Sequence, residues 1–495
     1  MTKPSDSPLH GSRDSRGRNE RAVADGANGR GANGRGENER ECSRRRFLVA
    51  AGVGTTASAF AGCLSQAPGD EGETTTTDDG AGPTTERNAD STTAWPAFGH
   101  DARNSGHAPD ATGPASDATV EWRFDGETPT MNSSPVVVDG TVYVPGSGDP
   151  GYVHAVDAET GESEWRFEPD GYASSAPAVV DGTLYVGTWG RKFYALDAAT
   201  GDPVWQATVG HRLGSSSPVV SDGVVYVGTV GDGPLVVGGD DDEQFEPCAV
   251  LALDAETGEE RWRYDDFGEK ENVESSPALA DGRVHVGSES GLYALDADTG
   301  EVAWERTDVQ TNADVSPAIV DGVVYYGAPN TADDGPPANL YAFDAATGDT
   351  RWTTGIDDVS LRTSPAVADG TVYVAASTTR ACIPEADECS GTSRGRMYAV
   401  DAATGERRWT APIETDTRSS PAVIGDRVYV GCRNGVSAVT TDGEAAWRID
   451  FEGDREDGPY VKSSPAVADG RLFVGASDGR SEEHTSELQS LSHIS

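Results

Sequence analysis

One phrase recurs eight times along most of this chain. Its fullest form reads Ser-Ser-Pro-Ala-Val-x-Asp-Gly-x-Val-Tyr-Val-Gly, and successive copies lie 40–59 residues apart. A second phrase, Tyr-Ala-Leu-Asp-Ala-x-Thr-Gly-x-x-x-Trp, follows most copies. A period of this length built from short β segments is typical of propeller blades. The prolines that mark the copies are Pro135, Pro177, Pro218, Pro277, Pro317, Pro365, Pro421 and Pro465.

Each copy divides into four expected strands. Ser-Pro-Ala-Val forms the first, and the Asp-Gly pair forms a hairpin turn, because glycine tolerates positive φ there. Thr-Val-Tyr-Val alternates with period two and forms the second strand. Leu-Tyr-Ala-Leu-Asp forms the third, Thr-Gly turns the chain, and the segment that carries the tryptophan forms the fourth. We therefore predict an all-β fold of four-stranded antiparallel blades.

The ends of the repeat region predict how the ring closes. The eighth hairpin, Ser463–Gly475, has no tryptophan after it, whereas an unmatched Trp122 precedes the first hairpin. We expect residues 120–124 to supply the outer strand of the last blade, which closes an eight-bladed ring over residues 95–479 and removes a free sheet edge. The segment 95–101 is expected to pack on the rim of this ring. Residues 480–495 lack the repeat pattern and resemble translated adapter sequence, so we interpret them as a non-native tail.

The second phrase resembles the tryptophan-docking motif of the pyrroloquinoline quinone (PQQ) repeat family. That family includes quinoprotein alcohol dehydrogenases and the non-enzymatic outer-membrane assembly lipoprotein BamB. The resemblance covers about residues 95–479 and implies that each tryptophan packs on the neighbouring blade. A buried indole contributes a large apolar area while its N–H bonds a carbonyl. The residues expected in this structural role are Trp122, Trp165, Trp205, Trp262, Trp304, Trp352, Trp409 and Trp447.

The first 94 residues are expected to direct and tether the protein. Residues 1–42 are polar and predicted to be disordered. Residues 43–62 combine Arg44 and Arg45 with a short apolar stretch, which indicates a Tat export signal. The signal ends in a lipobox-like Phe-Ala-Gly-Cys, so we expect Cys63 to carry lipid; a single signal-anchor helix and an ordinary signal are the alternatives. Residues 63–94 are rich in Thr and Asp and predict a linker. The body is then extracellular, anchored to the outer face of the cytoplasmic membrane.

The charge of the chain excludes several classes of partner. With 38 Lys+Arg against 83 Asp+Glu, the formal net charge is −45. Such a chain repels nucleic-acid phosphates and anionic lipid surfaces, so no nucleic acid is expected and membrane contact is limited to the lipid anchor. Only four residues are lysine. This acidic, lysine-poor composition resembles that of haloarchaeal proteins, and we predict a need for molar salt.

The residues give little sign of a catalytic site. The family's quinoprotein enzymes bind PQQ and Ca²⁺ in the channel with carboxylates, a tryptophan floor and typically adjacent cysteines. This chain has no adjacent cysteine pair, and Trp189 is its one spare tryptophan within the blades. Packing at the channel mouth is the simpler interpretation of Trp189, with a floor role as the alternative. No histidine has metal-ligand spacing. We therefore expect no catalytic, cofactor or metal residues.

Two insertions interrupt the repeat. Residues 230–247 contain the acidic run Asp240–Glu243, which we interpret as a solvated loop, with a Ca²⁺ site as the alternative. Residues 376–394 contain Cys382 and Cys389, a candidate disulfide in an exported protein. Cys248 and Cys432 are left as buried thiols.

These observations favour a non-catalytic, BamB-like scaffold, monomeric and without cofactor, that binds other surface or secreted proteins. A haloarchaeon has no outer membrane, so barrel assembly itself does not carry over. Two alternatives stay open: a PQQ- and Ca²⁺-dependent quinoprotein dehydrogenase, and a surface carbohydrate-binding propeller. A carboxylate cluster beside a flat aromatic ring in the channel would favour the dehydrogenase.

Overall fold

The structure is a computed structural model that describes residues 94–493 with gaps at 117, 127–129, 149, 232–246, 269–271, 310, 312–313, 331–335, 359–360, 378–380, 383–388, 391–393, 414, 452–458 and 478–485. The chain divides into two units, Met1–Pro83 and Thr84–Ser495, and every described residue belongs to the second. Arg44, Arg45, Cys63 and the acidic run Asp240–Glu243 lie outside the described residues.

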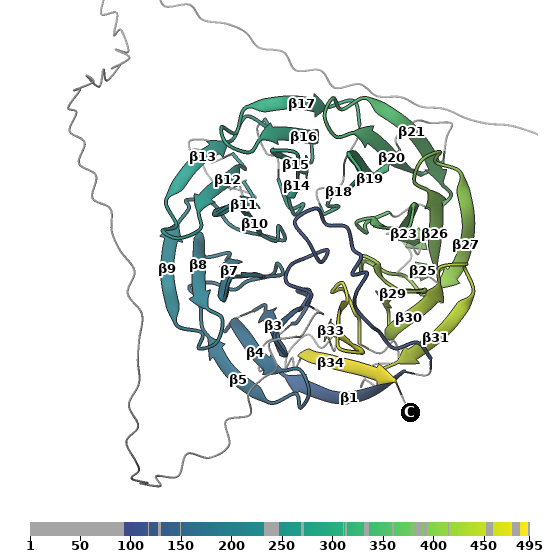
Figure 1. Cartoon of the computed structure of the whole chain (residues 1–495), viewed down its shortest axis with the longest axis horizontal. Coiled ribbons are helices and arrows are strands. Elements are labelled where there is room, and N and C mark those ends of the chain that lie inside the picture. The colour runs from purple at the N-terminus through teal and green to yellow at the C-terminus, as the bar shows by residue number, and fades with distance from the viewer. Residues whose placement is uncertain are drawn as a thin grey trace, which may run out of the picture. The chain divides into compact units, whose positions relative to one another are not determined.

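The second unit is an all-β propeller of four-stranded antiparallel blades arranged in a ring (Figure 1). In seven of the sheets the four strands follow one another along the chain, and these are blades 1 to 7. Blade 1 comprises β2 Val136–Val138, β3 Thr141–Gly146, β4 Tyr152–Asp157 and β5 Ser163–Phe167, and blade 2 comprises β6 Ala178–Val180, β7 Thr183–Gly187, β8 Lys192–Asp197 and β9 Pro203–Thr208. Blade 3 comprises β10 Val219–Ser221, β11 Val224–Gly228, β12 Val250–Asp254 and β13 Glu260–Tyr264, and blade 4 comprises β14 Ala278–Ala280, β15 Arg283–Ser288, β16 Gly291–Asp296 and β17 Val302–Arg306. Blade 5 comprises β18 Ala318–Val320, β19 Val323–Pro329, β20 Ala338–Asp344 and β21 Thr350–Ile356. Blade 6 comprises β22 Ala366–Ala368, β23 Thr371–Ser377, β26 Gly395–Asp401 and β27 Arg407–Ile413. Blade 7 comprises β28 Ala422–Ile424, β29 Arg427–Cys432, β30 Gly435–Thr440 and β31 Ala445–Asp450.

A further four-stranded sheet joins the two ends of this unit, and we call it the composite sheet. Its strands are β32 Ala466–Ala468, β33 Arg471–Ser477, β34 Ser486–His493 and β1 Ala118–Asp125. The outer strand β1 carries Trp122 and pairs with β34, as the unmatched tryptophan predicts. Strand β34 occupies the third position, where the repeat phrase is missing from the sequence.

The repeated Asp-Gly pairs form the hairpin turns between the first two strands of the blades. Asp139 and Gly140 have φ of 50° and 77°, and most other copies match them. Left-handed φ at both central residues is the type I′ geometry that suits the twist of a two-residue hairpin. The sequence prediction of these turns is therefore confirmed.

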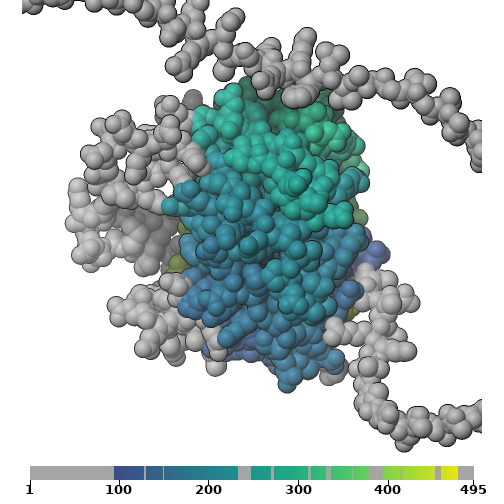
Figure 2. Space-filling view, turned by 90° about the vertical axis from the view of Figure 1, so that its left-hand side faces the viewer, coloured from purple at the N-terminus to yellow at the C-terminus, as the bar shows by residue number. Residues whose placement is uncertain are grey.

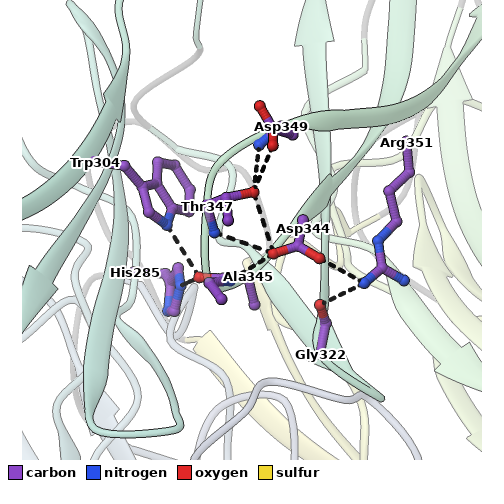
Figure 3. A network of polar contacts seen from close by, with 9 residues as sticks. His285, Trp304, Gly322, Asp344, Ala345, Thr347, Asp349 and Arg351 are labelled. Carbon is purple, nitrogen blue, oxygen red and sulfur yellow. Dashed lines mark hydrogen bonds and ion pairs between the residues drawn. The ribbon is translucent and has the colours of Figure 1, made fainter.

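Seven of the eight docking tryptophans bond the neighbouring blade, and Trp447 bonds Pro114, in the segment that precedes β1. Figure 3 shows one junction, where Trp304 Nε1 donates to the carbonyl of Ala345 in the turn of blade 5, 3.0 Å away. Asp344 holds that turn by accepting from the backbone N–H and hydroxyl of Thr347, and it also pairs with Arg351. The eight docking bonds measure 2.8–3.2 Å, from Trp122, Trp165, Trp205, Trp262, Trp304, Trp352, Trp409 and Trp447 to the carbonyls of Ala158, Ala198, Ala255, Ala297, Ala345, Ala402, Thr441 and Pro114.

The core lies between neighbouring blades. For example, Tyr143 and Val153 of blade 1 pack against Leu184 and Tyr194 of blade 2. The outer strands alternate between exposed and half-buried residues, as in β9, and form the side wall of the ring, which faces the viewer in Figure 2. Since each interface needs both partners, a blade is stable only within the ring.

The lead-in segment, Trp95–Gly106, crosses the centre of the ring (Figure 1, dark purple-blue trace). Our expectation that the start of this segment packs on the rim is wrong, because its carbonyls accept hydrogen bonds from the innermost strands. Asn104 is 1% exposed and donates to the carbonyls of Pro277 and Pro317. The backbone acceptors are Trp95, Pro96, Ala102, Arg103, Ser105 and Gly106, for the amides of Val137, Val179, Leu279, Ile319, Val367 and Val423, at 2.7–2.9 Å.

Candidate functional site

A cavity of about 400 Å³ lies at the channel, bordered by the segments that lead into the inner strands. Phe98 of the lead-in segment contributes to its lining, so this segment closes part of the channel beneath the cavity. The lining residues are Phe98, Thr130, Asn132, Ser134, Ser147, Tyr172, Ser174, Ser175, Ala176, Trp189, Ser215, Ser217, Asp314, Arg362, Ser364, Arg418, Ser420, Lys462 and Ser464.

Serine residues directly before the repeated prolines hold the cavity wall together. At seven of the eight contacts between neighbouring sheets, the backbone N–H at this position donates to the serine hydroxyl at the same position in the next sheet, at 2.8–3.1 Å. One of these donors is the N–H of Ala176, and the other six belong to serines. We call this the serine belt. Its residues in ring order are Ser134, Ala176, Ser217, Ser276, Ser316, Ser364, Ser420 and Ser464.

The residue three places before each proline forms a second ring, which we call the mouth ring. Unlike the serine belt, the mouth ring contains charged side chains. In ring order it reads Asn132, Ser174, Ser215, Glu274, Asp314, Arg362, Arg418 and Lys462. Two acidic residues therefore stand beside three basic residues, and the remaining three positions are uncharged.

The acidic pair lies on blades 4 and 5. Burial and the neighbouring Asp314 carboxyl raise the pKa of Glu274 to about 8. Arg362 Nη1 lies 3.7 Å from Asp314 Oδ2 on the other side. Asp314 is the one carboxylate among the described residues that line the cavity. The pair holds a proton near neutral pH and offers hard oxygen ligands of the kind that Ca²⁺ prefers.

The basic sector follows on blade 6, blade 7 and the composite sheet. Burial and the neighbouring Arg418 lower the pKa of Lys462. The Lys462 ammonium lies 5.7 Å from the ring centroid of Tyr460, and the guanidinium of Arg433 lies 5.6 Å from the same centroid. In a protein of net charge −45, this concentration of cations at one cavity favours an anionic ligand.

An aromatic pair stands in the uncharged sector. The rings of Tyr172 and Trp189 stack with centroids 5.7 Å apart at 24°. Trp189 Nε1 donates to Ser174 Oγ over 2.9 Å, which fixes the orientation of the indole. A Cβ at Gly214 would lie 3.7 Å from both Trp189 and Glu274 Oε1, so the aromatic pair reaches toward the acidic pair. The spare tryptophan therefore lines the cavity, at the channel mouth.

The sequence analysis missed the mouth ring. Its signal was available as the variable position within an otherwise regular phrase, where the copies change from Glu and Asp to Arg, Arg and Lys. Reading each copy for its constant residues hid this change.

The cysteines fall outside the cavity. The backbone of β24, Ala381–Cys382, and β25, Cys389–Ser390, places Cys382 opposite Cys389 in an antiparallel ladder. Cys248 and Cys432 are both buried thiols. Among the described residues, no group of three or more His, Cys, Asp or Glu is placed to hold a metal. Nor does any helix in the described ranges have the length and apolarity to cross a membrane.

A family model described as "Outer membrane protein assembly factor BamB", of the PQQ type, matches residues 110–238, 229–388 and 393–487. The chain belongs to this family of PQQ-like β-propeller repeat proteins. It is also 33% identical over 193 residues to the quinohemoprotein alcohol dehydrogenase of Comamonas testosteroni. That match covers 36% of this chain and 26% of the relative, so the chain spans about a quarter of the relative's length.

Solved structures of this propeller family have the same fold. The crystal structure of the Comamonas testosteroni enzyme has a TM-score of 0.63 at 18% identity and covers 82% of this chain and 81% of its own. A europium-containing methanol dehydrogenase has a TM-score of 0.61 at 14% identity, covering 81% and 98%. BamB from Moraxella catarrhalis has a TM-score of 0.51 at 18% identity, covering 76% and 98%.

These relatives correct three sequence predictions. We expected a non-catalytic BamB-like scaffold, no enzyme and no cofactor, because adjacent cysteines and a second spare tryptophan were absent. The relatives matched in sequence and structure are dehydrogenases, and the dehydrogenase structures have higher TM-scores than BamB. The error arose because the charged residues of the mouth ring lie outside the constant residues of the repeat.

The cavity residues fit the cofactor that this family implies. PQQ is a flat quinone with three carboxylates, and Arg362, Arg418 and Lys462 supply three cations at the same cavity as the flat Trp189 ring. Glu274 and Asp314 supply oxygen ligands for a divalent or trivalent cation. Because the described residues place no third carboxylate with this pair to hold a metal, the cation's other ligands would come from the cofactor or from water.

Proposed function

We propose that this protein is a quinoprotein-type dehydrogenase that oxidises an alcohol in its central channel. The observation that carries the proposal is the mouth ring, in which Asp314 and three cations border one cavity beside an aromatic ring, with Glu274 next to Asp314. Bound PQQ would supply a two-electron acceptor. The relatives named as alcohol and methanol dehydrogenases support this choice over the scaffold.

The protein's own residues would bind and orient the reactants. Arg362, Arg418 and Lys462 would hold the carboxylates of the cofactor by charge-assisted hydrogen bonds. Trp189, fixed by Ser174, would contact its flat face. Glu274 and Asp314 would hold the cation. Asp314 lines the cavity and would accept the hydroxyl proton of the alcohol as general base.

The first test is a titration of PQQ with Ca²⁺, and in parallel with Eu³⁺, into the folded protein in molar salt. We expect cation-dependent binding with a shifted quinone absorbance and dye-linked alcohol oxidation. Arg418→Ala should weaken cofactor binding by about tenfold or more, the scale of one lost charge-assisted bond. Arg261→Ala, which removes a cation paired with Asp254 on the outer strand β13, is the charge-matched control.

Asp314→Asn separates binding from chemistry. The amide keeps the shape of the side chain but cannot accept the substrate proton, so turnover should fall by at least about 100-fold. Its cofactor affinity should fall less than that of Arg418→Ala, since the three basic residues remain and the amide oxygen of Asn can still ligate the cation. Absence of PQQ binding by wild-type protein that is folded in the same salt would overturn the proposed function.

We also propose that the native ring has eight blades and that the protein is exported and lipid-anchored. The hairpin of β32 and β33 and the strand β1 that carries Trp122 support the blade number, while Arg44 and Arg45 support export and Cys63 supports the anchor. A crystal structure would test the first point. Replacement of Cys63 by Ser should release the protein from the membrane fraction, whereas retention there would contradict the anchor.

A further inference from the structure

Lysine is rare in this chain, and one of the few lysines lines the cavity. Only four of the 38 basic residues are lysine, and Lys462 is the one that borders the cavity. The same position of the repeat holds arginine on blades 6 and 7, as Arg362 and Arg418. Both residue types supply a positive charge, but only a lysine can lose its proton and act as a nucleophile. Lys462 therefore offers a reaction that its arginine counterparts cannot perform.

The surroundings of Lys462 favour the neutral amine. The side chain is half-buried, and no carboxylate among the described residues forms an ion pair with it. Asp416, an acidic residue of the same sector, is paired instead with Arg433 over 3.1 Å. Burial, and after it the charge of Arg418, lowers the pKa of Lys462. A lysine that is desolvated beside another cation is the usual form of a nucleophilic amine.

Tyr460 gives this amine a defined position. The backbone of Tyr460 forms antiparallel bridges with Arg433 on one side and with Ser477 on the other. The ring of Tyr460 is therefore held by the sheet, and the Lys462 nitrogen lies 5.7 Å from its centroid. The amine thus rests on a fixed aromatic ring at the edge of the cavity, which reduces the conformational entropy that it loses on binding a ligand.

Two kinds of chemistry at this edge determine the ligand. A neutral amine adds to the carbon of an aldehyde or ketone. Arg362 and Arg418 line the same cavity, and guanidinium groups bind carboxylates through charge-assisted hydrogen bonds. A small molecule that carries a carbonyl group next to a carboxylate would use both the amine and the neighbouring guanidinium.

We propose that Lys462 is a covalent binding site for oxo acids, which it holds as a Schiff base while Arg418 pairs with the carboxylate. The Lys462 nitrogen bonds to the carbonyl carbon, and the carbonyl oxygen leaves as water with the two protons of the neutral amine. No oxidant or reductant takes part in this step. The site goes beyond the proposed function, because it acts in the protein without cofactor.

The test is reductive trapping on the full chain, without PQQ, in molar KCl. The protein is treated with glyoxylate and cyanoborohydride, which converts the imine to a stable secondary amine, and the modified lysines are mapped by mass spectrometry. Lys192, which is paired with Asp170 over 3.1 Å, is the internal reference. Lys462 should be modified at least about tenfold faster than Lys192, because more of it is present as free amine.

Acetaldehyde tests whether the carboxylate of the ligand matters. The ratio of Lys462 to Lys192 labelling within one sample cancels the different intrinsic reactivities of the two aldehydes. This ratio should be about tenfold lower with acetaldehyde than with glyoxylate, which is the scale of one charge-assisted bond. Arg418→Gln should lower the glyoxylate ratio by a similar factor. Arg418 is exposed, so the variant should remain folded, which its thermal unfolding checks.

Two conservative variants complete the design. Lys462→Arg keeps the positive charge but should abolish the adduct at position 462, with no change at Lys192. Lys192→Arg is the matched control and should leave the labelling of Lys462 unchanged.

Selective labelling of Lys462 that depends on the ligand's carboxylate and on Arg418 supports the oxo-acid site. Equal labelling of Lys462 and Lys192, or the same ratio with acetaldehyde as with glyoxylate, overturns it. Since PQQ is absent throughout, the failure of PQQ to bind in the earlier titration would leave this result unaffected, and the two proposals can fail separately.

Discussion

His285 occupies a position that is Tyr in six other blades. It is fully buried, and its Nε2 lies 3.2 Å from the Ala345 carbonyl, the same acceptor that Trp304 uses (Figure 3). In blade 5 the equivalent Tyr325 donates its hydroxyl to Ala402. Burial lowers the pKa of His285 to about 4. The imidazole is therefore held neutral, and its Nε2–H donates a hydrogen bond to the Ala345 carbonyl.

We predict that His285 makes the blade 4–blade 5 junction sensitive to acid. The unfolded chain protonates this residue near its usual pKa of about 6.5, so the stability it contributes is complete above that pH and is lost as pH falls toward 4. His285→Tyr should remove this loss, which amounts to about 3 kcal/mol. Urea unfolding of both proteins from pH 7 to pH 4 measures the difference in unfolding free energy. The carboxylates are the same in both proteins, so their contributions to the pH dependence cancel in this difference. Parallel pH profiles would contradict the prediction.

At the scale of single residues, constant and variable positions differed in how well they could be predicted. Trp304 and its counterparts were identifiable because the same packing requirement recurs at each junction. Glu274, Asp314 and Arg362 were not, because each occurs once and their role depends on their lying side by side on blades 4, 5 and 6. Ala176 was not identified either, because it differs from the other residues of the serine belt only in lacking a hydroxyl, and the belt itself was not predicted from the sequence.

The turn that receives each tryptophan requires glycine for two separate reasons. Gly300 has φ of +73°, and an added Cβ would lie 2.6 Å from the Trp262 ring. Gly282 has φ of +71° but no atom within 4 Å of such a Cβ. Gly282→Ala should cost about 1 kcal/mol from backbone strain alone. Gly300→Ala should cost roughly 1–3 kcal/mol more because the indole must shift. Thermal or denaturant unfolding of Gly282→Ala and Gly300→Ala measures the difference, which is the contribution of the contact between Gly300 and the Trp262 ring. An equal loss of unfolding free energy in the two variants would contradict this contribution.

The ladder formed by β24 and β25 gives the candidate disulfide a geometric basis. Directly opposite residues in an antiparallel pair have Cα atoms about 4.5–5.5 Å apart, which suits a disulfide. We predict that alkylation of the denatured, unreduced protein modifies Cys248 and Cys432 but not Cys382 and Cys389. Peptide mapping after reduction should then recover all four. Alkylation of Cys382 without reduction would rule the bond out.

Across the whole molecule, charge repulsion opposes the compact ring. The net charge of −45 is screened within about 3 Å at molar salt but over about 30 Å at 0.01 M. We predict that the melting temperature rises by several degrees or more from dilute buffer to molar KCl. Sucrose, which strengthens burial without screening charge, is the control. An unchanged melting temperature in KCl would exclude a halophilic requirement.

The blade architecture at this scale was the most predictable part of the protein. Eight copies of one phrase leave few ways to bury their apolar faces, and the unmatched Trp122 marked the closing strand. The path of the lead-in segment was not predictable, because its contacts are made by backbone carbonyls that carry no side-chain signature.

The lead-in segment also sets the order in which the molecule can mature. Its residues leave the ribosome before every strand they bind, and they pair with inner strands from β2 through β28, almost the full length of the ring. The seal beneath the cavity therefore cannot form until the last blades exist. A chain that stops short leaves the carbonyls of Ser105 and Gly106 without their donors on blades 6 and 7. The lead-in segment can therefore make all of its hydrogen bonds only after the strands up to β28 have been synthesised and have formed the ring.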